Sequence, residues 1–135
     1  MKLLGNFFHI NATDDSDSLN RGERREERGE NFRCQVQLDP DHPLYRVHFP
    51  GNPVTPGVLL LQMATEILEQ KFGTTLQFYC APSIKFKKAV TPDDAPSFVF
   101  SNISIQLGQL SVRLSIEADD QQFVKMSLQY QILDN

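Results

Sequence analysis

One histidine of this chain lies in a loop rich in proline and glycine, directly before an apolar segment. His48 opens the run His-Phe-Pro-Gly-Asn-Pro-Val-Thr-Pro-Gly-Val, which ends at Val58. Each of the three prolines in this run fixes its own φ at about −65° and restricts the residue before it. The backbone around His48 therefore has few alternative conformations, which suits an imidazole that must transfer a proton at a fixed position.

The element that must position this loop is a helix predicted over residues 56–72. Thr55 suits the N-cap, Pro56 the first helical position, and Gly73 the C-terminal stop. The first turns, residues 58–61, are apolar on every side. A helix that is apolar all round at one end is expected to be surrounded by other structure there.

Lower on the same helix, Gln62, Glu66 and Glu69 form a polar stripe at i, i+4 and i+7. Periodicity alone favours a stripe that faces solvent. By the same reasoning Glu66 is a surface or interface residue.

The rest of the pattern predicts an antiparallel sheet. Residues 31–38 alternate between apolar and polar, which is the period of a half-buried strand. The strand-like runs after Gly73 are residues 76–90, 97–107, 109–117 and 122–133. One substantial helix with a sheet of about five or six strands indicates an α+β fold in which the sheet curls around the helix.

The N-terminal third is uneven in composition. Residues 2–10 carry enough apolar side chains to dock on the core, as a short helix or an edge strand. Residues 11–30 are charged and nearly devoid of large apolar groups, so we expect a mobile loop or a protruding hairpin tip there.

Composition excludes several classes of protein. With 135 residues and 40% apolar residues, the chain fits a single domain over residues 1–135. The net charge of −4 argues against a nucleic-acid binder, and no apolar run is long enough to span a membrane. Cys34 and Cys80 lie in strand-like runs without metal-ligand spacing, so both are predicted to be buried thiols. We expect a cytoplasmic protein.

Three segments carry a resemblance to a known family. The residues from His48 to Gln62 are similar to the active-site segment of β-hydroxyacyl-acyl carrier protein dehydratases, the hotdog-fold enzymes of fatty acid synthesis. Residues 84–94 resemble that family's lysine-bearing strand and turn, and residues 38–45 its lead-in. Together these cover roughly residues 32–133. The resemblance implies a hotdog fold and an obligate dimer, either a homodimer or a higher oligomer of dimers, with active sites at the subunit interface.

The resemblance also implies a reaction in fatty acid or polyene-type lipid synthesis. The histidine at position 48 removes the C2 proton of a 3-hydroxyacyl thioester carried on the phosphopantetheine of acyl carrier protein. The residue at position 62 assists departure of the 3-hydroxyl. Backbone N–H groups of Gly57 and Val58 suit the thioester carbonyl, because a helix N-terminus stabilises negative charge. Neither a metal nor a cofactor is implied.

Two positions depart from the family pattern. Val47 replaces the usual glycine before the histidine, and Gln62 replaces the usual acidic residue. An amide cannot transfer a proton near neutral pH, although it donates and accepts hydrogen bonds. Three explanations remain: His48 performs both proton transfers, Glu66 supplies the carboxyl, or dehydration has been lost.

Further predictions concern the substrate and the activity. Arg46, Lys85, Lys87 and Lys88 are candidates for a basic rim that docks the acidic carrier. Phenylalanines in the strands fit a tunnel for an acyl chain as well as they fit ordinary core packing. The alternatives to a dehydratase are a hotdog acyl thioesterase and a non-catalytic carrier-binding subunit of a heterodimer.

Overall fold

The computed structural model of the chain describes residues 2–15, 31–47, 51 and 53–133. These residues form six strands and two helices. The elements are β1 (Phe8–Asp15), β2 (Phe32–Leu38), α1 (Pro43–Val47), α2 (Gly57–Phe72), β3 (Thr75–Phe86), β4 (Ser97–Gln106), β5 (Gln109–Ala118) and β6 (Gln121–Leu133).

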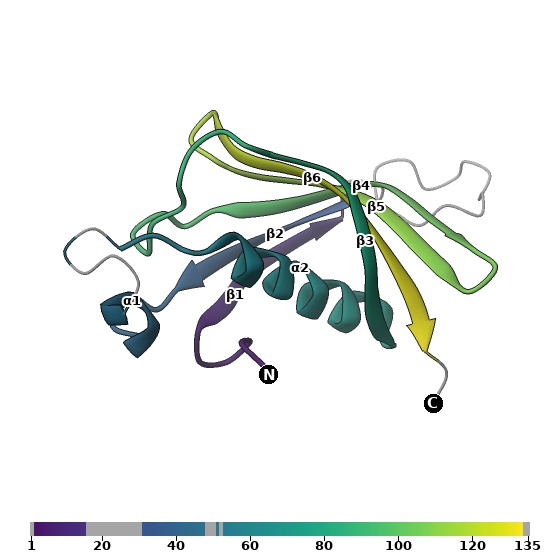
Figure 1. The fold of residues 1–135 in the computed structure, drawn as a ribbon, viewed down its shortest axis with the longest axis horizontal. Helices are drawn as coiled ribbons and strands as arrows, with labels where there is room; N and C mark the ends of the chain where they lie inside the picture. The colour runs from purple at the N-terminus through teal and green to yellow at the C-terminus, as the bar shows by residue number, and fades with distance from the viewer. Residues whose placement is uncertain (1, 16–30, 48–50, 52, 134–135) are drawn as a thin grey trace.

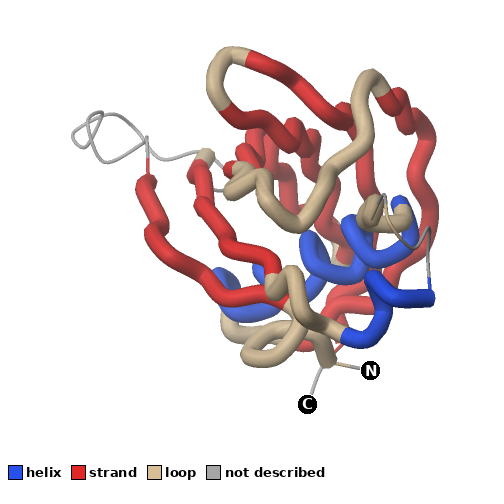
Figure 2. Tube along the Cα trace, turned by 90° about the vertical axis from the view of Figure 1, so that its left-hand side faces the viewer, coloured by secondary structure: helices blue, strands red, loops and turns tan. Residues whose placement is uncertain are grey.

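The six strands form one antiparallel sheet in the order β1-β2-β4-β5-β6-β3. The sheet is strongly curved, and α2 lies against its concave face (Figure 1). The view in Figure 2 shows both helices at the same side of the sheet. The strands β1 and β3 are therefore its two edges, and α2 is covered by strands that are far apart in sequence.

Strand β2 shows the predicted alternation of apolar and polar side chains. In β2 every second residue from Phe32 to Leu38 is buried, and β5 repeats this pattern from Leu110 to Ile116. These buried side chains join the core, together with most of α2. The prediction of a strand at residues 31–38 and of four later strands is confirmed.

One predicted strand is too long. The run 76–90 leaves the sheet after Phe86, because the N–H groups of Lys87 and Lys88 both donate to the carbonyl of Phe123, at 2.8 and 3.2 Å. The chain then turns over the start of α2, where the Thr55 N–H donates to the carbonyl of Val90 at 2.8 Å. Four residues of the predicted strand thus cover the helix N-terminus instead.

Helix α2 has 16 residues and begins one residue later than predicted. Its N-cap is Pro56, not Thr55, and no side chain caps it. The Thr55 hydroxyl is bonded to the Tyr45 hydroxyl instead, at 2.8 Å. At the other end Gly73 adopts the left-handed conformation (φ 64°) that the C-terminal stop requires, so that prediction is confirmed.

The first turn of α2 is not surrounded on all sides. Leu59 and Leu60 are buried, whereas the Val58 side chain is 73% exposed. The prediction of an enclosed first turn is therefore wrong for a single copy of the chain.

The N-terminal segment docks on the core, and part of it is the predicted edge strand. Phe7 and Phe8 are fully buried, and residues 8–15 form β1 beside β2. The expectation of a loop over residues 11–30 is wrong for residues 11–15, which pair with β2 because the edge of the sheet is available to them. Residues 16–30 lie outside the described residues.

The two cysteines are both free thiols. Cys34 is buried, as predicted, and burial raises the pKa of its thiol, while a hydrogen bond from Thr13 opposes that shift. Cys80 is only half-buried, at the edge strand β3, and it donates to Gln129. Its predicted burial fails because nothing described covers this edge.

A polar contact ties the middle of α2 to β6. The hydroxyls of Thr65 and Tyr130 lie 2.9 Å apart, and Tyr130 is completely buried. Burial raises the pKa of Tyr130 to about 12, with the Thr65 hydrogen bond opposing it. Burial of the tyrosine thus favours its neutral form.

We predict that Tyr130 makes the fold sensitive to alkali. Its pKa is raised in the folded chain, so this stabilisation is complete below pH ~10 and is lost as the pH rises toward 12. Urea unfolding between pH 9 and 11.5 should show a falling free energy of unfolding, and Tyr130→Phe should flatten that slope. The exposed Tyr79→Phe is the control; an unchanged slope in Tyr130→Phe would contradict the prediction.

Candidate active site

The lead-in to the histidine is the short helix α1, which ends at Val47. Val47 is 74% exposed and is the last residue of α1. The valine that replaces the family's usual glycine is thus accommodated in a helical conformation. His48 itself lies outside the described residues, so its predicted role stays a prediction.

A hydrogen bond between two buried side chains closes the base of the loop that carries the histidine. Tyr45 before the loop and Thr55 after it are joined by their hydroxyls, and both residues are buried. The Phe7 ring stacks on Tyr45, with centroids 5.4 Å apart. Burial raises the pKa of Tyr45, which keeps its phenol neutral and able to donate. The loop that contains residue 48 is thus anchored at both ends on the core.

The N-terminus of α2 lies at a pocket of about 420 Å³. The N–H groups of Leu59 and Leu60 donate to the carbonyl of Pro56, at 3.0 and 3.2 Å. The N–H groups of Gly57 and Val58 precede the first intrahelical bonds and carry the positive end of the helix dipole. Of the two predicted oxyanion donors, Gly57 lines this pocket and Val58 does not, and their role stays a prediction.

Close packing explains why residue 57 is a glycine. A Cβ atom there would lie 2.7 Å from Cζ of Phe86, which is closer than two non-bonded carbon atoms approach each other. The Phe86 ring lines the same pocket and is 58% exposed. The Phe86 ring, at the end of β3, thus lies directly against the start of α2.

The predicted basic rim is only partly brought together. Lys87 and Lys88 line the pocket at the start of α2, and their ammonium groups donate to Gln122 and Gln121 at 2.7 and 2.6 Å. Arg46 lies on α1 and donates to the carbonyl of Asp41 at 3.5 Å. No described contact joins Arg46 to the lysines.

The fourth predicted basic residue stands apart as well. Lys85 lies in β3, paired across the sheet with Lys125. Like charges on paired residues repel one another, so an anionic ligand near β3 would relieve that repulsion. Lys85 nevertheless does not line the pocket at the start of α2.

The polar stripe of α2 does not face solvent. Glu66 is only 5% exposed, so its predicted place at the surface or an interface is wrong. Its Oε1 accepts from the N–H groups of Leu3 and Leu4, at 3.0 and 2.7 Å. Its Oε2 accepts from the Leu3 N–H at 2.8 Å and from Nε2 of Gln62 at 2.7 Å. The docked N-terminal segment covers this face of the helix, which periodicity cannot reveal.

This bonding bears on the suggestion that Glu66 is the missing acid. Both of its carboxylate oxygens accept N–H groups, and two of the donors belong to the backbone of the N-terminal segment. A carboxylate held in this way faces the protein interior and not a substrate. The geometry therefore argues against Glu66 as the direct proton donor. Gln62 is the member of this stripe that lies nearest to the N-terminus of the helix.

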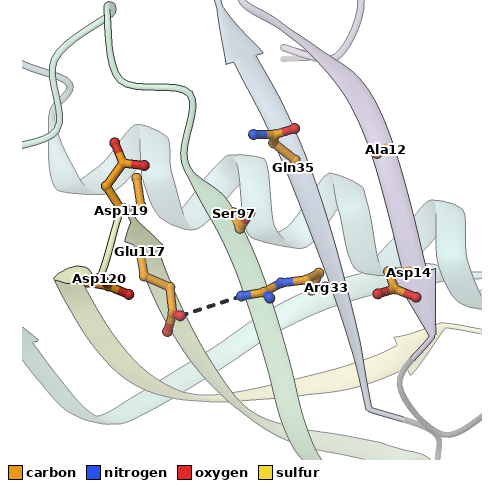
Figure 3. A pocket seen from close by; sticks show the side chains of 9 residues that line it. Ala12, Asp14, Arg33, Gln35, Ser97, Glu117, Asp119 and Asp120 are labelled. Atoms are coloured by element: carbon orange, nitrogen blue, oxygen red, sulfur yellow. Dashed lines mark hydrogen bonds and ion pairs between the residues drawn. The ribbon is translucent and has the colours of Figure 1, made fainter. Parts of the chain in front are cut away.

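A second pocket, of about 440 Å³, lies on the face of the sheet that is opposite α2. Figure 3 shows Arg33 and Glu117 pointing toward one another across it, with a nitrogen-to-oxygen distance of 3.5 Å. Both side chains are substantially exposed, so the pair adds only about 0 to 1 kcal/mol. The other residues that line it are Ala12, Asp14, Gln35, Ser97, Ala118, Asp119 and Asp120. The carboxylates of this pocket lie at the surface, and none of its lining residues belongs to the segment from His48 to Gln62, so the pocket at α2 is the stronger candidate.

Comparison with known proteins identifies the family. The model of the ApeI-like dehydratases matches residues 23–127, which include the whole segment from His48 to Gln62. The chain belongs to the ApeI-like dehydratase family. The docked N-terminal residues 2–15 lie outside the matched region.

A curated relative agrees with this assignment. The 3-hydroxyacyl-[acyl-carrier-protein] dehydratase FabZ of Levilactobacillus brevis is 35% identical over 104 residues. The aligned region covers 72% of this chain and 66% of that relative. The chain therefore spans just under two thirds of the relative's length.

Solved structures share the fold. An uncharacterised protein from Erwinia carotovora subsp. atroseptica covers 92% of this chain and 94% of its own, with a TM-score of 0.62 and 21% identity. The dehydratase heterocomplex ApeI:P from Xenorhabdus doucetiae covers 81% of this chain and 92% of its own, with a TM-score of 0.56 and 20% identity. A hypothetical thioesterase with coenzyme A from Streptococcus pneumoniae covers 97% of this chain and 92% of its own, with a TM-score of 0.62 and 12% identity. The antiparallel sheet with its helix is thus a hotdog fold, as predicted.

Sequence reasoning missed the residues that support the site. Phe86, Tyr45 and the N-terminal Leu3 and Leu4 touch it only because distant segments meet. The position of Glu66 between Ala64 and Ile67, which are both buried, was the one available signal for it, since buried carboxylates need partners.

We predict that Gly57→Ala displaces the Phe86 ring. The ring is the far end of a half-exposed side chain, so the free energy of unfolding should fall by about 1 kcal/mol or less. The added methyl and the displaced ring should narrow the pocket and raise KM for the thioester substrate that the family resemblance predicts by roughly tenfold, an effect of ~1.4 kcal/mol. Urea unfolding and steady-state kinetics measure both, and Gly57→Ala with Phe86→Ala should recover KM. An unchanged KM in Gly57→Ala would contradict the close contact.

Proposed function

We propose that this chain dehydrates a 3-hydroxyacyl thioester, bound to acyl carrier protein, to the trans-2-enoyl thioester in fatty acid or polyene-type lipid synthesis. The observation that carries the proposal is the match of the ApeI-like dehydratase family to the segment that contains His48, Gly57 and Gln62. The pocket at the start of α2 supports it, because Gly57, the Phe86 ring and two lysines meet there.

In the proposed reaction His48 takes the C2 proton of the substrate. The electron pair of the C2–H bond moves toward the thioester, whose oxygen gains negative charge. N–H groups of Gly57 and Val58 stabilise that charge at the positive end of α2. The C2=C3 double bond then forms as the C3–O bond breaks, and the hydroxyl leaves as water.

The departing hydroxyl needs a proton, and the structure favours one source. Glu66 is occupied by N–H donors, and the Gln62 amide does not titrate. The imidazolium of His48 carries the proton that it took from C2. We therefore propose that His48 performs both transfers, while Gln62 contacts the 3-hydroxyl and orients it.

The carrier is proposed to dock at Lys87 and Lys88, because both lysines border the pocket that would receive the thioester. Arg46 and Lys85 extend this docking surface in the proposal. The lysines are exposed and attract an acidic partner over a Debye length of about 8 Å at physiological salt. A cytoplasmic location remains a prediction; among the described residues, no helix combines the length and apolarity that a bilayer crossing requires.

An assay of wild type, His48→Ala and His9→Ala tests the proposed dehydration. Purified wild type should convert a 3-hydroxyacyl carrier or pantetheine thioester to the 2-enoyl product, measured by mass spectrometry. His48→Ala should lower kcat by roughly 10²- to 10⁴-fold, the usual contribution of a general base. His9 is exposed on β1, so His9→Ala should be as active as wild type.

Other outcomes of this assay select other functions. Release of free thiol without an enoyl product would identify a thioesterase. Binding of the acylated carrier without turnover would identify a non-catalytic subunit.

We also propose that the edge strand β3 pairs with a second subunit. Of the large apolar side chains exposed among the described residues, four belong to β3: Phe78, Tyr79, Ile84 and Phe86. An exposed apolar edge strand is a template for pairing with another chain. A second subunit over β3 would also lie beside Phe86 and so complete the pocket at the start of α2. The ApeI:P structure is named as a heterocomplex, so the partner is either a second copy or a related chain.

Mass measurement tests the proposed self-association through β3. Wild type should have about twice the chain mass of 15.4 kDa in light scattering after size exclusion. Tyr79→Asp should shift the mass toward the monomer, because it places charge at an apolar interface. Leu107→Asp, at a fully exposed turn position, is the matched control. A monomeric wild type would reject self-association and leave a heterodimer.

A further inference from the structure

A buried carboxylate lies directly behind the amide that replaces the usual acidic residue. Nε2 of Gln62 donates to Oε2 of Glu66 over 2.7 Å, one helical turn away. The Glu66 side chain is almost completely buried. The contact is short and charge-assisted, and bonds of that kind are about twice as strong as neutral ones.

The charge of Glu66 decides which end of the amide approaches it. An ionised carboxylate only accepts hydrogen bonds, so the NH2 group of Gln62 is attracted and its Oε1 is repelled. The Glu66 carboxylate is itself held by the N–H groups of Leu3 and Leu4. It therefore cannot rotate away without breaking bonds to the docked N-terminal segment.

We infer that Glu66 is a positioning residue that fixes the amide of Gln62 with its Oε1 turned away from the carboxylate, so that Gln62 meets the substrate as a hydrogen-bond acceptor. This inference rests on the proposed dehydration. The 3-hydroxyl of the substrate then donates its proton to Oε1 of Gln62. The lone pairs of the 3-hydroxyl oxygen then point away from Gln62 and can accept a proton from the imidazolium of His48. This proton converts the hydroxyl into the departing water.

The arrangement gives the N-terminal segment a role in the site. Leu3 and Leu4 lie outside the region that the family model matches, yet their N–H groups hold the residue that orients Gln62. Phe7 of the same segment stacks on Tyr45 at the base of the histidine loop. One docked segment therefore supports both halves of the site.

Glu66→Gln tests the inference, and Glu69→Gln is the matched control. Glu69 lies one turn further along α2 and also accepts a backbone N–H, that of Leu76 at 2.9 Å, but it does not contact Gln62 in any described bond. Both variants replace a carboxylate that binds the backbone, but Glu66→Gln should lose more stability in urea, because Glu66 is buried and accepts from two backbone N–H groups whereas Glu69 accepts from one. In Glu66→Gln the amide of Gln62 can turn either way, so kcat should fall roughly tenfold while KM stays within about twofold. Glu69→Gln should leave kcat unchanged.

A second measurement reports the amide itself and needs no activity. In wild type the two side-chain amide protons of Gln62 should give well-separated NMR signals, one of them shifted downfield and slow to exchange. The pair should lose this separation in Glu66→Gln and keep it in Glu69→Gln. If Glu66→Gln does not fold, the wild-type spectrum alone decides, because ordinary, fast-exchanging Gln62 signals would overturn the inference.

The outcomes separate this inference from the proposed function. Equal losses of kcat in Glu66→Gln and Glu69→Gln would overturn it, because a merely structural carboxylate acts in that way. A wild type without dehydratase activity, but with the amide signature present and lost only in Glu66→Gln, would reject the proposed function and support the fixed amide.

Discussion

Burial of helix α2 against the curved sheet is the interaction on which the other features depend. Six of its apolar side chains enter the core: Leu59, Leu60, Met63, Ala64, Ile67 and Leu68. Fully burying one such side chain is worth about 1.5 to 3 kcal/mol, so the helix is fixed as a rigid body. Its N-terminus, where Gly57 and Val58 present their N–H groups, is fixed with it. The proposed stabilisation of the thioester oxyanion therefore depends on the packing of one element.

A helix whose inward face is buried must satisfy the polar residues of that face inside the protein. An isolated charge in the interior is very unfavourable, so each buried carboxylate requires donors. Glu66 obtains them from Leu3, Leu4 and Gln62, and Glu69 obtains one from Leu76. The N-terminal segment is therefore ordered on the helix by the same requirement that orients Gln62. Stability and the geometry of the site are coupled here.

The predictions succeeded where local pattern decides structure. Alternation predicted β2, strand-like runs predicted the four later strands, and Gly73 predicted the end of α2, because pleat period and backbone conformation are local properties. They failed where a distant segment intervened. Val58 was expected to be covered and is exposed, while Glu66 was expected near the surface and is buried. Both errors arise because the faces of a helix are equivalent until its neighbours are known.

The sequence by itself determined the family, the fold class and the positions of the residues proposed to react. The spacing of prolines, glycines and His48 is a property of the chain, and backbone stiffness follows from it directly. Only the tertiary structure decided how those residues are supported. Phe86 over Gly57, Tyr45 bonded to Thr55, and the N–H groups of Leu3 and Leu4 on Glu66 are contacts between segments that folding brings together. Their physical reason is the compact burial of α2, which no local pattern encodes.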